Sequence, residues 1–197
     1  MTVDEAIGDL PLLKGRLNEE FWEYTSAPQN PYQKYARKGS DARYVRLHKS
    51  NGVSEAAMKV VRHVKEGQGL RSVPLEFLPG RFKRMRKISD GSLRRDCTTL
   101  YHRLARNRPA YTITCYFRNV ASGPFVHPLE NRSLSYREAA RLMSFRDSYD
   151  FCGARLPAQI GNAVPPLLAR AIGVHLMKLL GAAELGHELR MASSRGS

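Results

Sequence analysis

The sequence predicts an α+β fold: an irregular region with short strands, followed by two helices near the C-terminus. Three observations indicate this class. Helical spacing of apolar residues is confined to a few short segments and to the last third of the chain. Residues 111–117 have the β-branched and aromatic composition of a strand. The tyrosine-rich, basic stretch at residues 23–50 shows little periodicity and is typical of loops.

Length and charge narrow the class of protein. The chain has 197 residues, enough for one domain, or for one domain with an appendage. Its 32 Lys and Arg against 18 Asp and Glu give a net charge of +14, which attracts polyanions such as nucleic acid. No run approaches the roughly 18 apolar residues that a membrane-spanning helix needs, so we expect nucleic acid rather than a membrane as the partner.

The cysteines exclude two kinds of site. There are three, Cys97, Cys115 and Cys152, with no CxxC pair, and the six histidines are scattered. This spacing fits neither a disulfide framework nor a zinc ribbon, so we expect no metal. Reduced thiols and the lack of a signal-peptide pattern predict a cytoplasmic protein. We expect Cys115, in the middle of the predicted strand, to be structural rather than nucleophilic.

The first half shows two helix starts. Thr2 and Glu5 form a capping box, and the helix that they begin ends by Gly8. Ser54 is a candidate cap for a helix over residues 54–65. Between them, the tyrosines of residues 23–50 either form a nucleic-acid surface or pack a polar loop onto the body of the protein.

Five cations within residues 81–87 form the densest basic run. Such a run is either a solvated face or a set of phosphate contacts. We take Lys83, Arg84, Arg86 and Lys87 as the candidate DNA contacts. Further positive charge comes from arginines near the predicted strand: Arg94, Arg95, Arg103, Arg106, Arg108 and Arg118.

The last third is the most regular part. Ser135 and Glu138 form a second capping box. After Gly161 and Asn162, the prolines 165 and 166 lead into a helix over residues 164–180 with an apolar face, because proline is tolerated in a first turn. That face needs a partner surface.

These segments, in this order, resemble the C-terminal part of bacterial DNA (cytosine-5) methyltransferases. Residues 132–145, RSLSYREAARLMSF, look like the family's ninth motif, and residues 159–166, QIGNAVPP, look like the tenth. Residues 109–114 are similar to the end of the target-recognition domain, and residues 2–11 to the segment after the eighth motif. The ninth motif departs from the family pattern only at Met143 and Arg146, where Gln and Pro are usual.

The resemblance implies a division of the chain. Residues 1–13 would be a connector, 14–131 the target-recognition domain, 132–181 the segment with the ninth and tenth motifs, and 182–197 a flexible tail. The two C-terminal helices would pack on a Rossmann-like catalytic domain that this sequence does not contain.

The resemblance also implies site residues. Asn162, Ala163 and Val164 would contact S-adenosylmethionine, although a Gly-Asn pair before a helix is otherwise a simple turn and cap. Thr112 and Ile113 would lie near the flipped base. We add Arg118 and Arg137 to the expected DNA contacts, since arginine suits phosphates and guanine edges.

The catalytic motifs of that family are absent from this sequence. There is no Pro-Cys nucleophile, no Glu-Asn-Val and no Phe-x-Gly-x-Gly turn, so we assign no catalytic residue. The resemblance implies the DNA-recognition portion of an enzyme that flips cytosine out of duplex DNA and methylates C5 from S-adenosylmethionine. A restriction-modification role and a catalytic-half polypeptide follow as expectations. The alternatives are a stand-alone, non-enzymatic DNA-binding module and a truncated, inactive remnant.

Overall fold

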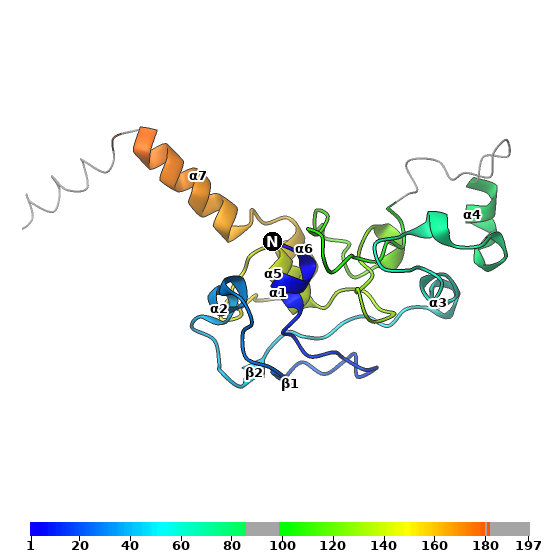
Figure 1. Ribbon diagram of the computed structural model, residues 1–197, viewed down its shortest axis with the longest axis horizontal. Helices are drawn as coiled ribbons and strands as arrows, with labels where there is room; N and C mark the ends of the chain where they lie inside the picture. Colours follow the sequence, from blue (N-terminus) through cyan, green and yellow to red (C-terminus); the bar gives the residue numbers. More distant parts are fainter. Residues whose placement is uncertain (86–98, 180, 182–197) are drawn as a thin grey trace, which may run out of the picture. The chain divides into compact units, whose positions relative to one another are not determined.

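A computed structural model describes residues 1–85, 99–179 and 181 (Figure 1). The chain forms two compact units, Met1–Ala163 and Val164–Ser197. Val3 and Leu13, from the expected connector, share one hydrophobic core with Ile113 and Ile160.

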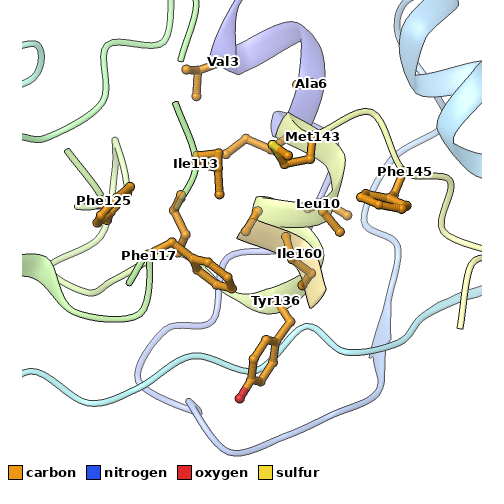
Figure 2. Packing of buried hydrophobic residues seen from close by; sticks show 14 of the residues in the cluster. Val3, Ala6, Leu10, Ile113, Phe117, Phe125, Tyr136, Met143, Phe145 and Ile160 are labelled. Atoms are coloured by element: carbon orange, nitrogen blue, oxygen red, sulfur yellow. The ribbon is translucent and has the colours of Figure 1, made fainter. Parts of the chain in front are cut away.

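Short capped helices build the centre of the first unit. Helix α1 (Val3–Ile7) begins at the predicted capping box, in which the Thr2 hydroxyl accepts from the Glu5 amide at 3.2 Å. It contacts α2 (Pro31–Arg37) and α5 (Tyr136–Leu142), and α5 contacts α6 (Leu156–Gly161). Figure 2 shows Ile113, Phe117 and Ile160 meeting in the core between them.

The β-structure is small. Strands β1 (Trp22–Glu23) and β2 (Tyr44–Val45) pair antiparallel, with Trp22 opposite Val45. The strand predicted over residues 111–117 is wrong: the described backbone has no regular structure at 111–114 and turns at 115–118. The Phe117 amide donates to the Thr114 carbonyl at 3.1 Å, so Ile113 and Phe117 reach the same core from a turn instead of alternating along a strand.

A second hydrophobic cluster lies under α3 (Glu55–Val61) and α4 (Gly80–Met85). Ser54 caps α3 as predicted, and Val60, Val61 and Phe82 are buried. Three short 3-10 turns complete the described elements: η1 (Leu70–Ser72), η2 (Leu75–Phe77) and η4 (Val120–Ser122).

The second unit contains α7 (Pro166–Leu179), where the sequence predicted a helix over residues 164–180. None of its residues is buried, and large apolar side chains including Leu168, Ile172 and Leu176 are about half exposed. Besides the two expected C-terminal helices, the described residues contain α6, which ends at Gly161. No helix among the described residues is long and apolar enough to cross a membrane.

Candidate DNA and cofactor interface

The end of α6 touches the segment at residues 112–115. Gly161 is the last residue of α6, and an added Cβ there would lie 2.2 Å from the Cys115 nitrogen and 2.3 Å from the Thr114 carbonyl carbon. Such distances leave room for a hydrogen only. The predicted cofactor loop and the predicted DNA segment therefore lie backbone against backbone.

The three residues predicted to contact the cofactor differ in exposure. Asn162 is the C-terminal cap of α6 and is exposed, and its amide side chain bonds to no residue in the described part of the chain. Ala163 is half buried against the core, and Val164 is exposed. Asn162 thus presents its amide to solvent, whereas Ala163 packs against the core.

The two residues predicted near the flipped base, Thr112 and Ile113, also differ in exposure. Thr112 is exposed, and within the described residues its hydroxyl has no partner. Ile113 is only 3% exposed and belongs to the core (Figure 2), so it cannot contact a base directly. The assignment of Ile113 as a DNA contact is corrected: it anchors the segment that presents Thr112.

A buried carboxylate organises the ninth-motif segment. Arg132 donates two hydrogen bonds of 2.7 Å to the Glu138 carboxylate, and the Ser135 amide donates a third. The His127 Nε2 lies 3.5 Å away, while His127 Nδ1 accepts from the amides of Leu129 and Glu130, so Nε2 carries the proton. Burial lowers the pKa of His127 to about 4, so the imidazole is neutral at pH 7.

A second buried network ties α5 to the N-terminal segment. Arg141 donates to both oxygens of Asp147 and to Asp9, and Asp9 also accepts from Arg37. Burial favours the neutral form of Arg141, but the two carboxylates outweigh it and raise the pKa of the guanidinium. Together these ion pairs fix α1, α2 and α5 as one support.

Two expected sources of DNA-facing charge are buried instead. Arg137 is fully buried and donates to the carbonyls of Arg46 and Arg146, so its assignment as a DNA contact is corrected to a structural role. Arg103 is buried too, and it donates to the carbonyls of Val61 and Val64 among others.

Arg118 is half buried and held in place. Its guanidinium lies 4.3 Å from the Tyr136 ring centre and donates to the Tyr136 hydroxyl and to Asn51. Its Nε is buried and lacks a partner in the described residues. Of the basic run, Lys83 is exposed, whereas Arg86, Lys87 and the side chain of Arg84 fall outside the described residues.

Another group of cations was missed by the sequence reasoning. Lys59, Arg62 and Lys65 are exposed on α3 and just after it, and none forms an ion pair within the described residues. By contrast, exposed arginines near the sheet are paired, Arg43 with Glu23 at 2.6 Å and Arg46 with Asp150 at 3.5 Å. The signal in the sequence was the polar face of the predicted helix over residues 54–65.

No group of His, Cys, Asp and Glu in the described part of the chain could hold a metal ion. Cys115 is half buried and Cys152 exposed, both as free thiols, and Cys97 falls outside the described residues.

Comparisons with known proteins point to one family. The sequence profile of C-5 cytosine-specific DNA methylases matches residues 3–178. M.DdeI, a type II methyltransferase of Desulfomicrobium norvegicum, is 32% identical over 181 residues, which cover 87% of this chain and 41% of the relative. M.AquIB, a type II methyltransferase of Picosynechococcus, is 35% identical over 113 residues, which cover 48% of this chain and 77% of the relative.

A solved structure has the same fold. It is described as a DNA modification methyltransferase encoded within a prophage of E. coli, and it matches with a TM-score of 0.51 and 20% identity over 83% of this chain and 42% of that chain. The chain thus spans less than half the length of M.DdeI and of this structure.

Proposed function

Because the chain belongs to the C-5 cytosine-specific DNA methylase family, we propose that it is the DNA-recognition and C-terminal portion of a DNA (cytosine-5) methyltransferase. The enzyme would methylate C5 of cytosine in duplex DNA, and bound S-adenosylmethionine would supply the methyl group. The nucleophile and the main cofactor motif would come from a catalytic half outside these 197 residues.

The observation that carries the proposal is the contact between Gly161 and the backbone of Thr114 and Cys115. Two segments that are far apart in sequence adjoin at this contact. One carries the exposed hydroxyl of Thr112, and the other carries the exposed amide of Asn162. Enzymes that act on a base must hold the duplex and the cofactor around one reacting atom. Adjoining segments of this kind meet that requirement.

The duplex would be held through phosphates by exposed cations that form no ion pair within the described residues: Lys59, Arg62 and Lys65 of the α3 region and Lys83 of α4. Free cations release counterions from DNA, whereas a cation already paired with a carboxylate gains less. Arg118, oriented by Tyr136 and Asn51, is the arginine best placed to keep a fixed geometry beside Thr112's segment.

The exposed apolar residues of α7 would dock on the catalytic half. A helix with Leu168, Ile172 and Leu176 about half exposed in water favours burial against another surface. M.AquIB supports a divided enzyme: 113 aligned residues cover 77% of it, so this methyltransferase is itself a shorter chain than the present one.

Mixing tests the proposal. The purified chain is combined with the part of M.DdeI that it does not match, and transfer of labelled methyl groups from S-adenosylmethionine to duplex DNA is measured. Methylation by the mixture, and by neither part alone, is the expected result. Salt-sensitive DNA binding by the lone chain, with no methylation by any catalytic half, would favour the stand-alone module. Neither binding nor methylation would favour an inactive remnant.

A further inference from the structure

We propose that Gly161 is a positioning residue through which cofactor binding and DNA binding strengthen each other. The inference rests on the proposed function, since it assumes that residues 162–164 contact the cofactor and that the segment of Thr112 contacts DNA. It goes beyond that function by assigning the route of coupling between the two ligands to one backbone contact.

The two backbones are in very close contact at Gly161. The three atoms nearest to an added Cβ at Gly161 are all backbone atoms of Thr114 and Cys115, at 2.2, 2.3 and 2.6 Å. Backbone atoms cannot rotate away as the end of a flexible side chain can. A displacement of either segment is therefore passed directly to the other.

Both segments are also anchored next to the contact. Ile160 is fully buried and Ile113 is 3% exposed, and both belong to the same hydrophobic cluster (Figure 2). Close-packed interiors transmit strain instead of absorbing it. Thr112 and Asn162 project outward from this rigid junction, so a ligand that moves one changes the position of the other.

Coupling of this kind is reciprocal. If the cofactor raises the affinity for DNA by some factor, DNA raises the affinity for the cofactor by the same factor, and factors of about 5 to 150 are typical. For the native junction we expect a factor within that range. A methyl group at position 161 would force the segments apart and bring the factor close to one.

The test uses the assembled enzyme and two glycine variants. Gly161→Ala is compared with Gly52→Ala, where the nearest atom to the added Cβ is Leu17 Cδ1 at 3.9 Å. The dissociation constant of S-adenosylhomocysteine is measured with and without duplex DNA, and that of DNA with and without S-adenosylhomocysteine. Gly161→Ala should reduce the coupling factor at least fivefold, and Gly52→Ala should leave it unchanged.

A merely structural role would weaken both affinities and keep their ratio, which would overturn the proposal. If Gly161→Ala fails to assemble, hydrogen exchange on the unmodified enzyme decides. S-adenosylhomocysteine alone should slow exchange at residues 112–116, and DNA alone at residues 160–163; the absence of both effects contradicts the inference. An enzyme that methylates but shows no coupling sinks this inference only, whereas no methylation sinks the proposed function with it.

Discussion

Arg132 and Glu138 face each other in the core of the first unit, joined by two parallel hydrogen bonds of 2.7 Å. Burial alone would raise the pKa of the Glu138 carboxyl, but Arg132 and His127 outweigh it and hold that pKa well below its usual range. Glu138 is thus ionised in a nearly dry site, and it also accepts from the Ser135 amide at the start of α5.

Substituting Glu138→Gln should destabilise the chain by about 3 kcal/mol, because it leaves the buried Arg132 charge facing an amide. Glu130, 2.8 Å from Arg132, keeps the loss at the lower end of the range for broken buried pairs. Urea unfolding of the purified chain gives the number. The matched control is Glu23→Gln, which breaks an exposed pair with Arg43 and should cost much less, because solvent screens that pair. Equal losses of stability in the two variants would contradict the expected difference between the buried and the exposed ion pair.

Stability should fall as the pH falls from 6.5 toward 4. In that window the unfolded chain protonates His127 at its ordinary pKa of 6.5, while the folded chain, with a pKa of about 4, excludes the proton. The unfolded state binds more protons, so this group contributes a slope of about 1.4 kcal/mol per pH unit. The groups facing His127 are Glu138, Glu130, Arg132 and His48. Burial also lowers the pKa of His48.

Unfolding free energies of the native chain and of His127→Asn, measured at several pH values between 4 and 7, check this dependence. The asparagine oxygen can still accept from the amides of Leu129 and Glu130 but does not titrate. We expect a shallower slope in the variant. Parallel slopes would show that His127 does not carry the effect.

Three of the helix starts could be predicted from the sequence because their signals are local. Thr2, Ser54 and Ser135 each cap the helix that they were expected to cap, through side-chain hydrogen bonds to amides three residues on. Helix α2 carried a similar signal that was overlooked: the Asn30 side chain accepts from the Gln33 amide, and Pro31 opens the first turn.

What depended on distant contacts could not be predicted. Residues 111–117 have the composition of a strand, but they have no partner strand among the described residues. Ile113 and Phe117 are buried against α5 and α6 from an irregular segment and a turn. Likewise, a net charge does not distinguish cations in water from cations in the core. Arg103 and Arg137 were expected to add charge to a DNA-binding surface, but both side chains are buried and donate to backbone carbonyls.

Removing the exposed cations of α3 and of the turn after it, which form no ion pair within the described residues, should weaken DNA binding. The triple substitution Lys59→Gln, Arg62→Gln, Lys65→Gln should flatten the slope of log affinity against log salt by about 2 to 3, since each phosphate contact contributes about 0.9. The control is Arg43→Gln with Arg46→Gln, which removes exposed arginines already paired with carboxylates. Binding titrations with duplex DNA at several salt concentrations are the measurement. A larger effect in the control would indicate that the DNA-binding surface lies near the sheet of β1 and β2 instead.

The apolar face of α7 should be needed for association but not for folding of this chain. Leu168→Ser with Ile172→Ser should raise the Kd for a catalytic half by about 100-fold, because two half-exposed aliphatic side chains would no longer be available for burial at the interface. The Tm of the chain alone should stay the same. Arg170→Gln, a polar change at an exposed residue of the same helix, is the control for titration by light scattering. Unchanged association in the double variant would place the docking surface elsewhere.

The claim that this chain recognises the DNA is tested most directly by asking which half determines the methylated sequence. Two hybrids share one catalytic half from M.DdeI; one is completed by this chain and the other by the matching part of M.DdeI itself. Bisulfite sequencing of methylated DNA identifies the cytosines that each hybrid modifies. We expect the target sequence to change when this chain replaces its counterpart. An unchanged target sequence, with methylation intact, would contradict the claim that these 197 residues recognise the DNA.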